Sequence, residues 1–256
     1  MQLFDTHSHL NDACFDDMLP EILDDAREAG LVGIAVIGYD LQSSRRAVEL
    51  AQQHAGYLHA VVGIQPNSVA ESATQDFDNI VELANQPGVI AIGETGLDCY
   101  WDDTPLADQQ TMFDRHMDLC LALDRPMVIH MRESCDLIVE QLRRRETVPP
   151  GVMHSFTGTV EQCQQCLDLG LMISFAGMVT FKNNESLRQV AAMVPPDRLL
   201  VETDAPYLSP EPLRGRRPNR PGRVRHTLEC VANARGVAAA ELATQTTLNA
   251  QRFYRV

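Results

Sequence analysis

The chain has 256 residues, of which 45% are hydrophobic, and a formal net charge of −14 at pH 7. This length fits one large α/β domain or two small ones, and the acidic balance taken alone argues against a nucleic-acid binder. No apolar run reaches the ~18 residues that would span a bilayer, and no charged region followed by an apolar one marks a signal peptide.

Short apolar runs alternate with segments of helical periodicity along the chain. We predict eight strands, at residues 3–7, 33–38, 58–64, 89–94, 126–131, 151–156, 171–177 and 199–204. Helical patterns lie between them at 18–30, 43–56, 77–88, 106–126, 133–146, 159–170 and 184–194, with two more at 224–236 and 238–254. Eight strands alternating with helices over about 250 residues predict a (β/α)₈ TIM barrel.

A doubly wound open sheet is the competing α/β fold. Such sheets usually carry a glycine-rich turn after the first strand, whereas residues 5–12 here contain no glycine. No linker, repeat or low-complexity stretch interrupts the pattern, so we expect residues 1–256 to form a single TIM-barrel domain.

Ionisable side chains gather at the predicted strand ends, where barrels of this kind carry their chemistry. They are His7, His9, Glu94, His130, His154 and Asp204. Side chains two apart on a strand share a face, ~6.5–7 Å apart at Cα, so His7 and His9 can converge on one ion. Each residue alone fits a structural role, but the whole set suits two ions that share a carboxylate and keep open positions for water.

The metal itself is not fixed by these residues. Nitrogen and oxygen ligands without a thiolate are compatible with Mg, Mn, Zn or Fe. Glu202 shares the parity of Asp204 and is expected one layer deeper, either orienting a ligand or as a structural acid.

The chain resembles the TatD family of metal-dependent deoxyribonucleases, among the amidohydrolase-like barrels. The resemblance rests on residues 3–11 (LFDTHSHLN), 126–136 (PMVIHMRESCD) and 190–206 (VAAMVPPDRLLVETDAP), with GETGLD, HSFTG and NRP between and after them. These motifs occur in the family's order and span almost the entire chain.

The resemblance implies roles for the six residues and for four others. His7, His9 and Asp204 would bind one ion, His130 and His154 would hold the second, and Glu94 would bridge them. Arg132, Asn219 and Arg220 would face the substrate phosphate. Gln65 stands where the family usually has a histidine; it can donate a hydrogen bond to phosphate but cannot carry charge or transfer a proton.

The basic residues narrow the choice among related barrels. Many relatives bridge their metals with a carbamylated lysine on strand four, but the sole lysine, Lys182, follows the seventh predicted strand. Residues 213–225 hold six arginines after strand eight, which favours local phosphate binding at the rim, with a solvated or internally paired loop as the alternative.

These residues predict a two-metal hydrolase that cleaves phosphodiester bonds of DNA. Asp204 is the candidate general base for a metal-activated water, and Arg132 would neutralise charge on the phosphate. The resemblance implies 3′-5′ exonuclease action on single strands. A metal-dependent ester or amide hydrolase, such as a D-aminoacyl-tRNA deacylase, is one alternative, and a non-catalytic nucleic-acid-binding barrel is another.

The seven scattered cysteines predict reduced thiols and a cytoplasmic location. Cys163 and Cys166 form an isolated C-x-x-C pair, for which helix packing is favoured over zinc binding. We expect a monomer with no membrane contact and no obligate protein partner, because a closed barrel leaves no free sheet edge.

Overall fold

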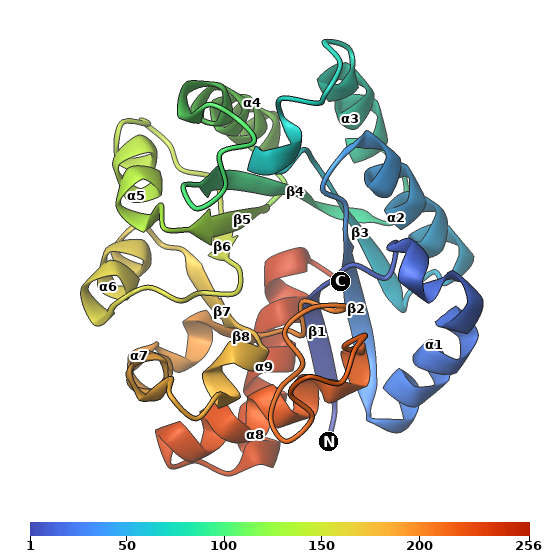
Figure 1. Cartoon of the computed structure of the whole chain (residues 1–256), viewed down its shortest axis with the longest axis vertical. Coiled ribbons are helices and arrows are strands. Elements are labelled where there is room, and N and C mark those ends of the chain that lie inside the picture. Colours follow the sequence, from blue (N-terminus) through green and yellow to red (C-terminus); the bar gives the residue numbers. More distant parts are fainter.

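The computed structural model covers residues 1–256 and contains one sheet of eight strands in the order β1 to β8. All neighbouring strands pair in parallel, so the predicted (β/α)₈ barrel is confirmed (Figure 1). The strands are β1 (Leu3–Ser8), β2 (Leu31–Ile37), β3 (Leu58–Val62), β4 (Val89–Asp98), β5 (Met127–Arg132), β6 (Gly151–Met153), β7 (Met172–Phe175) and β8 (Leu199–Val201).

All nine predicted helices are present. They are α1 (Leu19–Glu28), α2 (Leu41–Gln53), α3 (Asp76–Ala84), α4 (Leu106–Leu123), α5 (Cys135–Arg143), α6 (Val160–Asp168), α7 (Glu185–Met193), α8 (Val224–Arg235) and α9 (Ala239–Tyr254). Five 3-10 helices cover Ala13–Met18, Pro66–Ser68, Gly177–Thr180, Pro196–Arg198 and Pro221–Arg223. Helices α1 to α8 surround the ring of strands (Figure 1).

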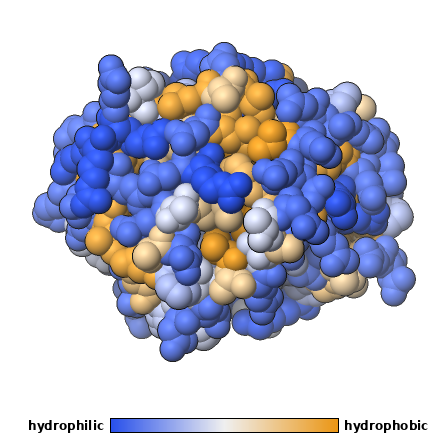
Figure 2. All heavy atoms as spheres, turned by 90° about the horizontal axis from the view of Figure 1, so that it is seen from above, coloured by the Kyte–Doolittle hydropathy of each residue, from blue (hydrophilic) through white to orange (hydrophobic).

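The surrounding helices are amphipathic, which explains their packing on the barrel. In α2, Ala47, Leu50 and Ala51 are buried against the sheet, while the opposite face is polar. Asp40 begins this helix with a capping box, since its carboxylate accepts the backbone N–H of Ser43. Hydrophilic residues therefore cover most of the flank seen in Figure 2, with hydrophobic residues gathered in patches between them.

The barrel closes between β8 and β1 through few main-chain contacts, all near the carboxyl ends of the strands. Ser8 and Ala205 form an isolated bridge, and the N–H of Asp204 donates to the carbonyl of His7 at 2.9 Å. Deeper in the barrel, the hydroxyl of Tyr254 on α9 donates to the carbonyl of Thr6 at 2.9 Å. The C-terminal helix thus supports the seam where the ladder is incomplete.

Several predicted strand limits differ from the structure, and three of them concern the strands that carry Glu94, His154 and Asp204. Glu94 was expected to close strand four, but β4 continues to Asp98 and pairs there with β5 after a register shift between Ile92 and Thr95. Conversely, β6 and β8 end at Met153 and Val201, so His154 and Asp204 lie on the loops that follow. The glycines at 93 and 96, both at positive φ, allow the irregular course of β4.

The cysteines and the helices agree with the expectations for packing. All seven cysteines are free, and Cys163 and Cys166 are both buried on α6, as helix packing predicts.

None of the helices combines the length and apolar character needed to cross a membrane. That residues 1–256 form a single domain stays a prediction.

His116 on α4 ties the outer layer to the cavity end of β3. Its Nδ1–H donates to the carbonyl of Met112 at 2.8 Å, and its Nε2 accepts the N–H of Ile64 at 3.1 Å. Only the neutral ring can make both bonds. Burial lowers the pKa of His116 to about 4.

This depressed pKa predicts a pH-dependent loss of stability. The unfolded chain protonates near its ordinary pKa of 6.5, so the contribution of His116 is complete above that pH and is lost as the pH falls toward 4. Between pH 7 and 4.5, wild type should lose about 2 kcal/mol more unfolding free energy than His116→Gln. Urea unfolding followed by circular dichroism measures this, and an equal loss in both proteins would contradict a neutral His116.

Candidate metal centre

The six predicted ligands meet at the mouth of the barrel, although they come from elements far apart in the sequence. A cavity of about 760 Å³ opens there and is lined by five of them: His9, Glu94, His130, His154 and Asp204. The sixth, His7, is fully buried beside them. The strands β1, β4 and β5 and the segments after β1, β6 and β8 therefore deliver ionisable side chains to one place.

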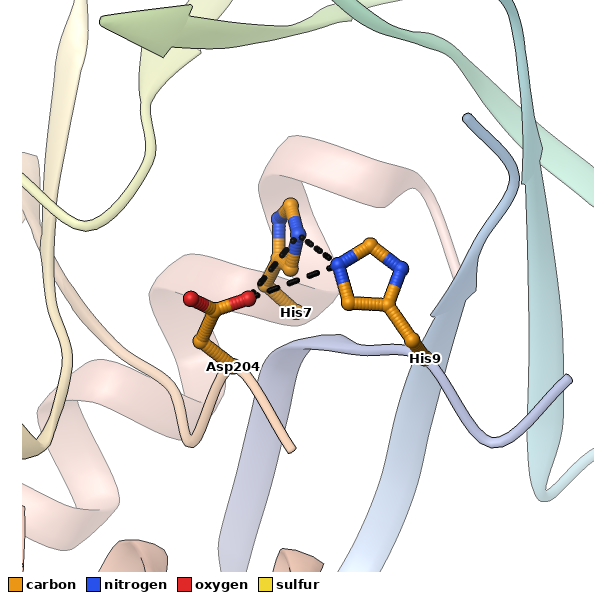
Figure 3. Close-up of side chains that lie close together, drawn as sticks. All are labelled: His7, His9 and Asp204. Atoms are coloured by element: carbon orange, nitrogen blue, oxygen red, sulfur yellow. Dashed lines mark hydrogen bonds and ion pairs between the residues drawn. The ribbon is translucent and has the colours of Figure 1, made fainter. Parts of the chain in front are cut away.

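His7, His9 and Asp204 form the first group of potential ligands (Figure 3). The two Nε2 atoms are 3.3 Å apart, and Asp204 Oδ1 is 3.7 Å from His7 Nε2 and 3.4 Å from His9 Nε2. Two ligands at ~2.0–2.1 Å from one tetrahedral ion lie roughly 3.3 Å apart, so these distances fit a shared cation.

The surroundings of His9 and Asp204 aim their ligand atoms at this point. Nδ1–H of His9 donates to the carbonyl of Ile37 at 3.0 Å, which leaves the Nε2 lone pair free for a cation. Asp204 has a φ of 54°, a left-handed conformation that is uncommon for residues other than glycine. Its hydrogen bond to the His7 carbonyl holds this backbone in place.

Glu94, His130 and His154 form the second group. Glu94 Oε1 lies 2.7 Å from His130 Nδ1 and 3.0 Å from His154 Nε2. Its other oxygen, Oε2, lies 3.7 Å from His7 Nε2 and 3.9 Å from His9 Nε2. The two oxygens of Glu94 thus face the two groups, which is the arrangement a bridging carboxylate requires.

The charges in the centre are strongly coupled. Burial alone would raise the pKa of Glu94, but the attraction of His154 and the hydrogen bonds from His130 and His154 outweigh it and hold that pKa well below its usual range. Burial and the nearby His154 lower the pKa of His7 well below its ordinary value. Glu94 is therefore ionised and His7 neutral, the protonation states that metal binding by these residues would need.

The outer nitrogens of the second group are held by carboxylates. His130 Nε2 is 2.9 Å from Asp98 Oδ2, and His154 Nδ1 is 3.2 Å from Glu202 Oε1. Such carboxylate partners fix the orientation of a ligating imidazole and raise its basicity. The contact of Glu202 with His154 is the one that an orienting residue would make, and the orienting role, one of the two that the sequence left open, stays a prediction.

Asp98 is the residue that the sequence analysis missed at this site. It also accepts hydrogen bonds from Asn67 and from the backbone N–H groups of Tyr100 and Trp101, at 3.1, 2.9 and 3.1 Å. Burial opposes ionisation, but the hydrogen bonds, led by that from His130, lower the pKa of Asp98 to about 2. Asp98 lies four residues after Glu94, so both side chains point to the same face of β4. The prediction ended this strand at Glu94, and Asp98 was therefore not recognised as a residue of the site.

Two of the four predicted substrate contacts lie at the cavity. Gln65, after β3, and Arg132, at the end of β5, both line it. The Arg132 guanidinium carbon lies 3.8 Å from the centroid of the Tyr100 ring, and the guanidinium forms no intramolecular hydrogen bond or ion pair. Its donors are therefore free to bind an anion.

Asn219 and Arg220 do not line the cavity, which differs from the expectation. Asn219 is fully buried and donates to the carbonyl of Thr203 at 3.0 Å, so it supports the loop after β8. Arg220 pairs with Glu21 at 2.7 Å and Asp25 at 2.6 Å, because α1 presents these carboxylates beneath the loop. Both side chains are committed to the protein itself.

The other arginines of the loop at residues 213–225 also differ in whether they bind the protein itself or face the cavity. Arg223 donates to the carbonyls of Arg216 and Pro218, and Arg225 pairs with Glu229. Of the six arginines in the loop, Arg217 alone lines the cavity, where Arg132 is the other cationic side chain, while Arg214 and Arg216 are exposed on the loop and form no ion pair.

Comparison with known proteins places these residues in a wider context. A family model described as "TatD related DNase" matches residues 4–255. The uncharacterized metal-dependent hydrolase YabD of Bacillus subtilis (strain 168) is 36% identical and aligns over 99% of both chains. The 3′-5′ ssDNA/RNA exonuclease TatD of Erwinia tasmaniensis is 33% identical over 99% of this chain and 100% of that protein.

A solved structure agrees with these sequence relatives. The TatD homologue YJJV from Escherichia coli K12 superposes with a TM-score of 0.93 at 28% identity, covering 99% of this chain and 98% of that one. The likeness therefore extends over the full barrel and its mouth.

The carboxylates behind the histidines should control metal affinity. Replacing Asp98 or Glu202 by alanine removes the acceptor that orients His130 or His154, and should weaken divalent-metal binding about 10- to 100-fold. Competition with a fluorescent chelator measures this affinity. Asp102→Ala, an exposed carboxylate on the nearby loop, is the matched control. Equal affinities in all three variants would contradict the orienting role.

Proposed function

This chain belongs to the TatD-related DNase family, and from that premise we propose that it hydrolyses phosphodiester bonds of DNA as a 3′-5′ exonuclease on single strands. Membership makes it a metal-dependent hydrolase that acts on ester bonds. The polarity and the single-stranded substrate follow relatives that are named 3′-5′ ssDNA/RNA exonuclease.

The observation that carries the proposal is the position of Glu94 between two groups of ligands. His7, His9 and Asp204 would hold one divalent ion, and His130 with His154 would hold another, with Glu94 shared between them. Mg, Mn and Zn all accept such nitrogen and oxygen ligands. Bound divalent ions supply an activated water at neutral pH and stabilise charge on phosphoryl oxygens.

The protein's own side chains would then position the phosphate and deprotonate the attacking water. Asp204 lines the cavity and is partly open to it, so its carboxylate can accept a proton from a water held there. Arg132 presents uncommitted N–H donors that match phosphate oxygens and would neutralise charge growing on them. Gln65 adds a neutral donor on the same wall.

A single-stranded end suits the shape and charge of this mouth. The chain carries a net charge of −14, and only Arg132 and Arg217 bring positive charge to the cavity lining. Attraction for a phosphate backbone is thus strongest at the cavity and the adjoining loop, while the net negative charge of the chain opposes long duplex contacts. A free strand end can enter where a duplex finds no continuous basic track.

The proposal includes a cytoplasmic, monomeric protein without an obligate partner. All seven cysteines are free, which suits a reducing compartment. The strands pair in an unbroken series from β1 to β8, and the seam is covered by α9, so no open sheet edge calls for a partner.

Loss of one ligand tests the catalytic proposal. His130→Ala should lower turnover on a labelled single-stranded oligonucleotide about 100-fold or more, since a bound cation contributes several kcal/mol to the transition state. His54→Ala, at the C-terminal end of α2 and away from the cavity, should retain wild-type turnover. Chelation should abolish activity, and added Mg²⁺, Mn²⁺ or Zn²⁺ should restore it.

The substrate panel decides between phosphodiester and other ester chemistry. Duplex DNA, RNA of the same sequence and a D-aminoacyl-tRNA are assayed beside the single strand. Cleavage of the aminoacyl ester alone would support a deacylase instead. Wild-type turnover by His130→Ala would contradict the metal-centred mechanism altogether.

A further inference from the structure

An exposed aromatic pair lies beside the candidate metal centre and has no role in holding metals. Tyr100 and Trp101 follow β4 and are 50% and 49% exposed, among the most exposed large hydrophobic residues of the chain. Their rings meet edge to face, with centroids 4.9 Å apart. Trp101 lines the same cavity as His130, His154 and Asp204.

Hydrogen bonds tie the backbone of the pair to a carboxylate that contacts the metal centre. Asp98 accepts the backbone N–H groups of Tyr100 and Trp101, and the same carboxylate contacts Nε2 of His130. A single buried side chain thus sets the distance between the aromatic pair and the metal centre. Aromatic rings that leave about half of their surface exposed beside a candidate site favour a binding role, because a ring that served packing alone would be more fully buried.

Arg132 connects the pair to the phosphate. Its guanidinium carbon lies 3.8 Å from the centroid of the Tyr100 ring and 5.5 Å from that of Trp101. Tyr100 covers one face of the Arg132 guanidinium, and the guanidinium N–H donors make no hydrogen bond within the protein. An anion bound by Arg132 would therefore lie next to the Trp101 ring.

The charges around the pair indicate which part of a nucleotide would occupy it. Asp102 and Asp103 follow Trp101 and are both exposed. These two carboxylates add negative charge next to Trp101 in the chain, so a neutral group suits the aromatic surface and the phosphate suits Arg132. A base stacks on an aromatic ring whatever its sequence, provided that it is unpaired.

We propose that Trp101, with Tyr100 and Arg132 beside it, forms a subsite that stacks an unpaired nucleobase next to the phosphodiester at the metal centre. This inference rests on the proposed nuclease function and adds a determinant of its substrate. A base inside a duplex has both faces covered, so the subsite selects single-stranded ends.

Trp101 is the only tryptophan in the chain, so its fluorescence reports on the subsite directly. The probe is a short oligothymidylate with hydrolysis-resistant phosphorothioate linkages, titrated into the metal-loaded protein. It should quench the Trp101 emission. The same oligomer with abasic residues at its last two 3′ positions should not. Equal quenching by both oligomers, or by neither, would overturn the proposal.

Turnover gives a second and separate reading. On a single-stranded DNA with all its bases, Trp101→Ala should lower kcat/KM about 5- to 150-fold, the usual range for one stacked base. On the DNA with abasic 3′ positions, the variant and wild type should match. Trp101→Phe should keep most of the activity on both, because it retains an aromatic face.

The outcomes separate this inference from the proposed function. If wild type cleaves no oligonucleotide, the nuclease proposal fails, and the fluorescence titration alone decides whether the subsite exists. If wild type cleaves base-bearing and abasic strands equally, the subsite is wrong while the nuclease proposal stands. Tyr207 is a second exposed aromatic residue that lines the cavity, and a base effect that disappears in Tyr207→Ala but persists in Trp101→Ala would also refute the proposal.

Discussion

The arrangement at the barrel mouth depends on how β8 is joined to β1. The ladder between these strands is incomplete, and the connection is made where the chain leaves β8. Asp5 accepts the N–H of Thr203 at 2.9 Å across 198 positions of sequence, and His7 accepts the N–H of Asp204. These few bonds bring Asp204 to His7 and His9. Loss of this closure would separate the first group of ligands without disturbing most of the helices.

Glu94 lies between the first group of ligands, which this closure assembles, and the second group. It lies on the long, irregular β4, and its two oxygens face opposite groups of imidazoles. Four carboxylates, Asp5, Glu94, Asp98 and Glu202, are buried in or just behind the mouth. Burying so many acids together is unfavourable unless positive charge accompanies them. Burial lowers the pKa of His154, but the charge of Glu94 and the hydrogen bond with Glu202 outweigh it and raise that pKa well above its ordinary value, so the ring of His154 supplies part of that charge in the free protein. Divalent cations would supply it in the working enzyme.

The sequence predicted the parts of this protein that follow from periodicity and spacing. Eight strands, nine helices and the six strand-end residues could be recognised because each signal is local or falls at an expected strand end. Asp98 escaped because β4 runs past Glu94, an extension that depends on pairing with β5. Arg220 was assigned to the substrate by the family resemblance, and its ion pairs with Glu21 and Asp25 could not be read from the sequence because these partners on α1 are distant in it. Strand pairing places Asp98 in the site, and loop packing pairs Arg220 with α1. Both are tertiary properties that the sequence does not show locally.

The central claim is that six side chains hold two cations on either side of Glu94. Anomalous X-ray diffraction from crystals of the protein loaded with Mn²⁺ tests it most directly. The account predicts two strong peaks, one among His7, His9 and Asp204 and one between His130 and His154, each within bonding distance of a Glu94 oxygen. Two empty groups, or a single ion elsewhere in the cavity, would contradict it.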